Sequence, residues 1–112
     1  MNAVANHHVV ELNGANFAQE VLAAGNLVLV QFWAGWSDPC RAMAPMVESV
    51  ADAQAVPIKV ARVNVEENEA LTEEYGVRCV PTLLIFNLGS LADQIVGRAS
   101  EREVREKLAR FK

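Results

Sequence analysis

Cysteine is scarce in this sequence of 112 residues, which contains only Cys40 and Cys79. Two thiols cannot build a disulfide scaffold, and they cannot supply all four ligands of a structural zinc site. Histidine is equally scarce, and the side chains of the adjacent His7 and His8 would point to opposite faces of a strand. Solvated histidines are therefore favoured over weak metal binding. We expect no metal and no organic cofactor.

Long apolar runs and blocks of one charge are also missing. No apolar stretch approaches the ~18 residues of a membrane span, and residues 1–11 lack the basic start and apolar core of a secretory signal. Acidic residues outnumber basic residues by 14 to 10, and the basic residues are interleaved with acids. This pattern argues against nucleic acid or a membrane as a partner. We expect a cytoplasmic protein.

Apolar residues, by contrast, are plentiful and follow regular patterns. They make up 52% of the sequence, and a chain of this length buries roughly two-thirds of its unfolded surface. We therefore expect a single domain over residues 1–112. The spacing of apolar residues predicts strands near 7–12, 27–33, 58–65, 83–86 and 91–96. It predicts helices near 13–25, 39–51, 66–76 and 100–111.

Two of these elements carry specific expectations. Residues 27–33 are apolar on both faces apart from Gln31, which is typical of a central strand covered by helices on both sides. We interpret Gln31 as a buried amide that is satisfied by backbone or water. For the first helix we expect Asn13 or Asn16 as the cap, Gly25 as the stop, and an inner stripe of Phe17, Val21 and Leu22.

The sequence of residues 33–41, Trp-Ala-Gly-Trp-Ser-Asp-Pro-Cys-Arg, joins an apolar strand to a helix start. At such a junction the free N–H groups and the positive end of the helix dipole favour an anion, for example a thiolate. Residues 36–40 resemble the active site of thioredoxins, whose usual form is Trp-Cys-Gly-Pro-Cys. The flanking residues and the later Val80-Pro81-Thr82 add to this resemblance, and the predicted order of strands and helices fits it over nearly the whole chain.

The resemblance implies a thioredoxin fold, that is, an α/β protein with a central mixed sheet of about five strands flanked by about four helices. It implies a cis Val80–Pro81 bond and the lineage of the protein disulfide oxidoreductases. Ser37 then stands at the position of the attacking cysteine, and Cys40 stands at that of the resolving cysteine. Gln31 stands where the family holds a buried, proton-relaying aspartate, and Arg62, near that position, is expected to extend to solvent.

Serine at the attacking position changes the expected chemistry. A hydroxyl is a far weaker acid than a thiol, and no histidine is placed to activate it, so a serine hydrolase is disfavoured. Ser37 and Asp38 are explained by helix capping alone. Cys40 should be recessed, which favours an inert core residue over a redox participant.

The second cysteine and the surface around the turn leave alternatives open. Cys79 is expected to be exposed, either as a tolerated surface thiol or as a relocated attacking thiol that also links dimers on oxidation; the reduced protein should be a monomer. By resemblance, an apolar surface that binds a protein or peptide partner is formed by Trp36, Pro39, Val80, Pro81, Val96 and Gly97.

The sequence therefore predicts a thioredoxin-like protein in which ordinary dithiol reduction is lost or weakened. One alternative is a non-catalytic binding module that uses the surface around Trp36 and Pro81. Another is residual thiol–disulfide exchange through Cys40 or Cys79, with a thioredoxin reductase as a partner if redox activity survives. An engineered trapping mutant is disfavoured, because Gln31, Asp38 and Cys79 also depart from the family pattern and a trap would alter only one position.

Overall fold

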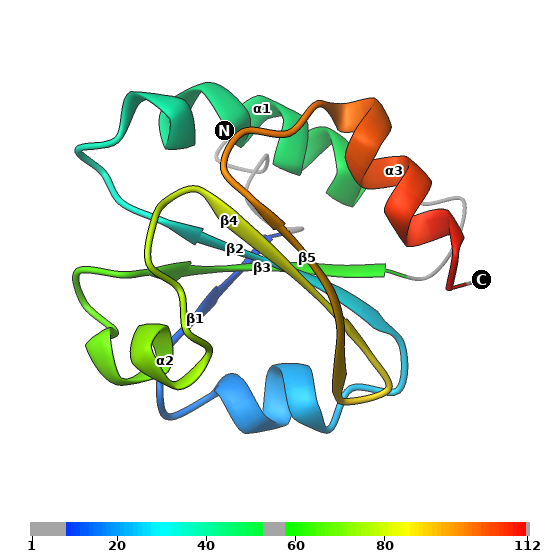
Figure 1. Cartoon of the computed structure of the whole chain (residues 1–112). Helices are drawn as coiled ribbons and strands as arrows, with labels where there is room; N and C mark the ends of the chain where they lie inside the picture. The colour runs from blue at the N-terminus through cyan, green and yellow to red at the C-terminus, as the bar shows by residue number, and fades with distance from the viewer. Residues whose placement is uncertain (1–8, 53–57, 112) are drawn as a thin grey trace, which may run out of the picture.

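The computed structural model describes residues 9–52 and 58–111. His7 and His8 lie outside these residues, so their interpretation stays a prediction. The described strands are β1 (Val9–Leu12), β2 (Leu27–Trp33), β3 (Ile58–Asn64), β4 (Thr82–Asn87) and β5 (Ser90–Val96). They form one mixed sheet in the order β1-β3-β2-β4-β5, in which β1, β3 and β2 are parallel and β4 and β5 are antiparallel to their neighbours (Figure 1). The predicted α/β class and central position of β2 are confirmed.

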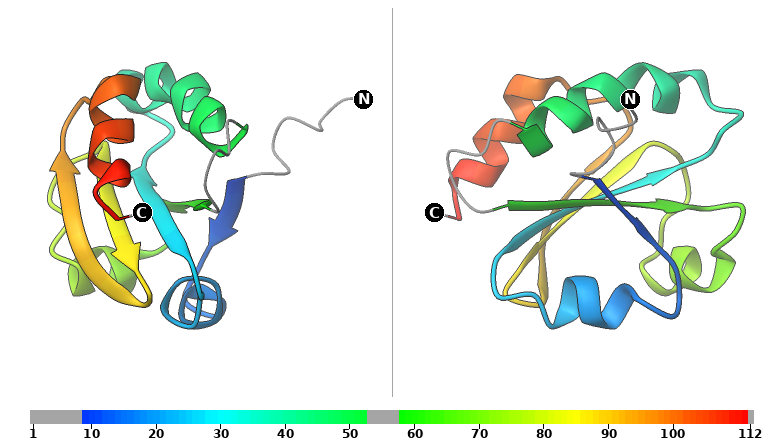
Figure 2. Two further views of the ribbon diagram at one scale, coloured as in Figure 1. Left: turned by 90° about the vertical axis from the view of Figure 1, so that its right-hand side faces the viewer. Right: turned by 180° about the vertical axis from the view of Figure 1, so that it is seen from behind.

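Helices cover both faces of this sheet. Helices α1 (Asp38–Asp52) and α3 (Glu101–Ala109) lie on one face, and the π-helical turn η2 (Ala18–Leu22) and α2 (Glu69–Glu74) lie on the other (Figures 1 and 2). Alternate residues of β2 serve the two cores, because Leu29 packs beneath α1 and α3 whereas Val30 belongs to the opposite cluster. None of the helices in the described part of the chain has the length and apolarity to cross a bilayer.

The first helical segment differs from the prediction. Asn13 Oδ1 accepts hydrogen bonds from the N–H groups of Ala15 and Asn16, so an asparagine does organise its start. The segment is a short π-helical turn, however, in which the N–H of Ala23 donates to the carbonyl of Ala18 at 2.9 Å. Leu22, the last residue of this turn, is 42% exposed rather than part of the inner stripe. The segment ends before Gly25, so glycine is not its stop.

Three aromatic rings hold η2 and α2 against β4. The Phe17 ring lies 5.3 Å from that of Tyr75 and 5.9 Å from that of Phe86, and the last two rings are 5.6 Å apart in an edge-to-face arrangement. Such pairs stabilise beyond the area that they bury. Burial, and to a smaller extent the charge of Glu74, raises the pKa of Tyr75.

The last helix, α3, begins with a side-chain cap. The Ser100 side chain accepts a hydrogen bond from the N–H of Glu103 at 3.1 Å, and Val104 and Leu108 face the core. Helix α3 also contacts α1: the Arg105 side chain donates a hydrogen bond to the carbonyl of Ser49 at 3.4 Å. These contacts fix α1, whose N-terminus carries the candidate site.

Candidate functional site

The turn after β2 places Ser37 as the capping residue of α1. The N–H of Cys40 donates to Ser37 Oγ at 3.3 Å, and the N–H of Arg41 donates to the Ser37 carbonyl at 3.1 Å. Ser37 is only 4% exposed. Its hydroxyl is therefore used to satisfy a helix N–H that would otherwise lack a partner.

Charges on the outside of this turn neutralise one another. Asp38, whose side chain is 83% exposed, forms an ion pair with Arg41 one helical turn later. Arg41 also donates to the carbonyl of Gly35 at 2.6 Å. The carboxylate is thus engaged by a guanidinium and is not directed at the Ser37 hydroxyl as a base.

The two cysteines occupy different environments, and both are free thiols. Cys40 is 3% exposed, whereas Cys79 is exposed on the loop before β4. Thr82 fixes that loop, because its hydroxyl donates to the carbonyl of Cys79 at 2.8 Å. Cys79 lines a hollow of about 140 Å³ together with Trp36 and Val80. The more accessible thiol is therefore not the one in the motif.

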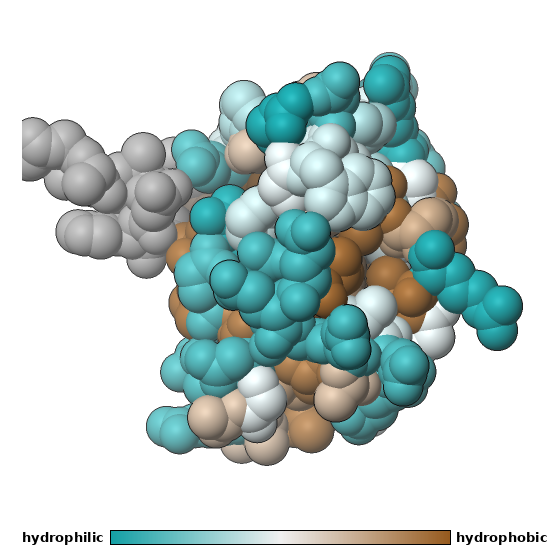
Figure 3. Space-filling view, turned by 90° about the vertical axis from the view of Figure 1, so that its left-hand side faces the viewer, coloured by the Kyte–Doolittle hydropathy of each residue, from teal (hydrophilic) through white to brown (hydrophobic). Residues whose placement is uncertain are grey.

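The six residues predicted to form the binding surface differ widely in exposure. Trp36 and Val96 are 67% and 59% exposed, Pro39, Val80 and Gly97 are half-buried, and Pro81 is buried. The Val80–Pro81 bond is cis, and the Pro81 carbonyl accepts a hydrogen bond from the N–H of Gly97 at 2.8 Å. At this end of the molecule apolar surface shows between hydrophilic side chains (Figure 3). Trp36 and Val96 are thus the exposed members of this surface.

A second, smaller cavity lies beneath Cys40. Its volume is about 90 Å³, and it is lined by Gln31, Trp33, Cys40, Arg41, Ala44 and Arg62. Gln31 is 2% exposed, and its Nε2 atom has no hydrogen-bond partner among the described residues. The Nε1 atom of Trp33 likewise has none among them. Contrary to one part of the expectation for Gln31, no backbone group of the described residues satisfies its amide nitrogen.

Arg62 also departs from its expected place in solvent. It lies opposite Gln31 in the parallel register of β2 and β3, forms an ion pair with Glu11, and holds its guanidinium carbon 4.7 Å from the centre of the Trp33 ring. Its side chain is 28% exposed. A cation over an indole face is a favourable arrangement, which explains why Arg62 folds back over the sheet.

Sequence reasoning missed Trp33 and Glu11 as parts of this arrangement. The signal that was available is the two-residue period of a strand, which puts Gln31 and Trp33 on the same face of β2. The contribution of Glu11 depends on the pairing of β1 with β3, which places it opposite Arg62. No local pattern indicates that pairing.

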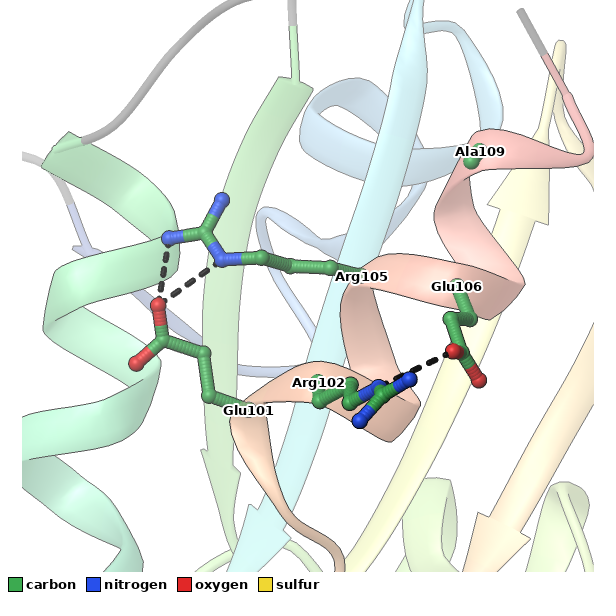
Figure 4. Close-up of a pocket in the computed structure, with 5 residues that line it drawn as sticks. All are labelled: Glu101, Arg102, Arg105, Glu106 and Ala109. Atoms are coloured by element: carbon green, nitrogen blue, oxygen red, sulfur yellow. Dashed lines mark hydrogen bonds and ion pairs between the residues drawn. The ribbon is translucent and has the colours of Figure 1, made fainter.

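Other hollows in the described part of the molecule offer less. One of about 480 Å³ lies along the outer face of α3, where Arg105 pairs with Glu101 and Arg102 pairs with Glu106 (Figure 4). Its charges are already matched within one helix. Among the described residues, no group of three or more histidine, cysteine or acidic side chains is arranged to hold a metal ion.

This geometry defines a class of protein: an α/β domain in which a central strand leads through a tight turn into a helix, with a cis-proline loop close to that turn. The thioredoxin family model matches residues 8–110. The chain is 46% identical over 83 residues to thioredoxin 1 of Synechococcus elongatus, covering 74% of this chain and 78% of that protein. It is 36% identical over 103 residues to the thioredoxin of Pyropia yezoensis, covering 92% and 96%.

A solved structure agrees with these relatives. A mutant thioredoxin from Halobacterium salinarum superposes with a TM-score of 0.85 at 32% identity, covering 93% of this chain and 90% of that one. The chain belongs to the thioredoxin family of thiol–disulfide oxidoreductases, and it has the thioredoxin fold.

Proposed function

We propose that this member of the thioredoxin family has lost the ordinary two-thiol reduction cycle and retains the surface that binds a protein or peptide partner. The observation that carries the proposal is the buried Ser37, which caps α1 at the position of the attacking cysteine. Disulfide reduction needs one thiolate to attack and a second thiol to resolve the mixed disulfide. Cys40 alone cannot perform both steps.

The surroundings of Ser37 support this loss. An alcohol becomes a useful nucleophile only when an adjacent base removes its proton. The nearest carboxylate along the chain, Asp38, is paired with Arg41. Cys40 is buried beneath the turn, where a protein disulfide cannot reach its sulfur without displacing the cap.

The retained surface has both apolar side chains and available backbone. Trp36 and Val96 are exposed, and in the described part of the chain no group makes a hydrogen bond to the backbone of Val80. An extended peptide can therefore pair with Val80 while its side chains contact the two apolar residues. A thioredoxin reductase is expected as a partner only if this protein keeps some redox activity.

An insulin-reduction assay with dithiothreitol tests the loss. We expect the protein to precipitate insulin no faster than dithiothreitol alone, whereas a thioredoxin with both cysteines accelerates the reaction. Acceleration by the unmodified protein would overturn the proposed loss. Fluorescence titration with a cysteine-free apolar peptide tests the surface, because Val96→Asp should weaken binding and the matched Leu91→Asp, on the same strand, should not.

Exchange through Cys79 is a second candidate function. Its support is the position of this exposed thiol in one hollow with Trp36 and Val80. On this account oxidation links two chains through Cys79. Non-reducing electrophoresis should show a dimer that Cys79→Ser abolishes and Cys40→Ser keeps; a dimer that persists in Cys79→Ser would contradict the assignment. The single domain and the cytoplasmic location also stay predictions.

A further inference from the structure

The cavity beneath Cys40 is rich in hydrogen-bond donors. Gln31 Nε2 and Trp33 Nε1 have no partner among the described residues, and Arg41 and Arg62 also line the cavity. None of the six lining residues carries a carboxylate. A buried donor without a partner is costly, so this cavity matches a group that brings an oxygen acceptor. A reduced thiol is only a weak acceptor.

We propose that Cys40 is a site of reversible oxidation by hydrogen peroxide, and that the Gln31 amide and the Trp33 indole hold the resulting sulfenic acid. In this step the thiol sulfur attacks one peroxide oxygen and the O–O bond breaks. The sulfur is oxidised by two electrons and becomes S–OH. The other oxygen takes the thiol proton and leaves as water. The new oxygen extends into the cavity, where the two N–H groups donate to it.

The size of the cavity limits which oxidants reach the sulfur. A volume of about 90 Å³ accommodates a small molecule such as hydrogen peroxide, since a cavity needs only about 10–15 Å³ to hold one water molecule. Two lining side chains, Arg41 and Arg62, are 60% and 28% exposed, so the cavity lies just beneath solvent. A folded protein with a disulfide is too large to enter.

The same structure explains why the oxidised form would persist. A sulfenic acid condenses rapidly with a nearby thiol, but Ser37 offers a hydroxyl at the adjacent capping position. Cys79 lines a different hollow that shares no residue with the cavity. Return to the thiol therefore requires two small external thiols: the first forms a mixed disulfide and releases water, and the second reduces that disulfide.

The test uses the full chain with Cys79→Ser, so that every adduct reports on Cys40. Native protein is exposed to hydrogen peroxide, and the peroxide is then removed. After increasing delays the protein is unfolded in urea that contains dimedone, because dimedone is larger than the reagents that reach the buried sulfur. Mass spectrometry follows the dimedone adduct on Cys40. We expect an adduct after oxidation of the native protein. No adduct after that oxidation, with labelling only when the peroxide acts on unfolded protein, would overturn the proposal.

Two variants test the donors separately. Gln31→Met keeps the length of the side chain and removes the amide, and Trp33→Phe removes the indole N–H. The free energy of one ordinary hydrogen bond corresponds to a roughly fivefold change in a rate or equilibrium constant. Each variant should therefore shorten the lifetime of the sulfenic acid by about that factor. The matched exposed change, Gln19→Met, should leave it unchanged. If Gln31→Met and Trp33→Phe both keep the parental lifetime, the proposal is wrong.

Thermal unfolding of the reduced proteins distinguishes this role from a merely structural one. Replacing an unpaired buried amide by an apolar group should leave the midpoint the same or raise it. A shorter sulfenic-acid lifetime without a lower midpoint thus supports the proposal. The outcome is independent of the insulin assay, because neither a partner nor a second cysteine takes part.

Discussion

The side-chain oxygen of Ser37 accepts a hydrogen bond from the N–H of Cys40 at 3.3 Å. In a thioredoxin with two cysteines, these two positions hold the redox pair. Here they are related as a cap and a capped residue, so the attacking position contributes to the stability of α1.

Removal of the cap should lower stability. Ser37→Ala deletes the acceptor of the Cys40 N–H, and such a change costs about 1 kcal/mol, within a range of roughly 0.5–2 kcal/mol. Ser100→Ala should cost a similar amount, because Ser100 caps α3 in the same way. Urea unfolding measures both, with the exposed Ser90→Ala as the control. A loss for Ser37→Ala no greater than that of the control would contradict the capping role.

The path of the chain could largely be predicted from sequence, because the elements that matter are locally encoded. The apolar run of β2, the cap at Ser100 and the period of α3 each depend on neighbours within a few residues. The environment of Gln31 could not be predicted. It depends on Arg62, which lies across the sheet and is turned back by Trp33 and Glu11.

The first helical segment shows the same limit on a smaller scale. The sequence correctly places Phe17 and Val21 in the core, but it misplaces Leu22. Phe17 is held in the core by the rings of Tyr75 and Phe86, whereas Leu22 is the last residue of the segment. Where the chain leaves the turn decides the exposure of Leu22, and residue spacing alone does not indicate that point.

Alkylation should distinguish the two thiols. Cys79 is exposed and Cys40 is 3% exposed, so iodoacetamide should modify Cys79 well before Cys40. Accessibility controls the rate for a reagent of this size. Mass-spectrometric mapping at timed intervals provides the measurement, and denatured protein serves as the control in which both react. Earlier labelling of Cys40 in the native protein would show that this interpretation of the two sites is wrong.

The hairpin between β4 and β5 should tolerate no side chain at Gly89. This residue has φ +85°, and a Cβ atom there would clash with the carbonyl oxygen of Leu22. Gly89→Ala should therefore cost more than the ~1–2 kcal/mol of left-handed strain alone. Gly76→Ala is the matched control, because Gly76 has φ +67° with open space around it. Equal losses for the two variants in urea unfolding would exclude the steric contribution.

Stability in acid should depend on Asp93. The N–H of Gln94, and next Lys107, lower the pKa of this carboxyl. A carboxyl whose pKa is lowered in the folded state stabilises the fold fully when the pH is above its unfolded-state pKa of about 3.9. This stabilisation is lost as the pH falls through the folded-state pKa. Asp93→Asn should remove this contribution, which is below about 1 kcal/mol because the side chain is 26% exposed.

Urea unfolding at about pH 6 and about pH 2.5 measures the effect of Asp93, since these values lie on either side of the carboxyl titration. The variant should lose less stability than the parent between them. The exposed Glu67→Gln serves as a control for the removal of one negative charge. If Asp93→Asn and the parent lose the same amount, the carboxyl does not contribute in this way.

Replacement of Ser37 by cysteine should restore part of the family chemistry. The central strand, Pro39, Cys40 and the loop at Pro81 are all in place, so the variant regains a Cys-x-x-Cys pair at the start of α1. Its activity should stay below that of an ordinary thioredoxin, because Gln31 cannot accept a proton as an aspartate can. Adding Asp38→Gly and Gln31→Asp should raise the rate further, by about an order of magnitude.

Insulin reduction tests whether the serine at position 37 is what separates this protein from an active thioredoxin. The unmodified protein, Ser37→Cys and the triple variant are measured side by side at equal concentration. We predict a background rate for the unmodified protein, clear turnover for Ser37→Cys and faster turnover for the triple variant. Turnover by the unmodified protein at the rate of the triple variant would contradict this prediction, because Ser37 would then not be the missing nucleophile.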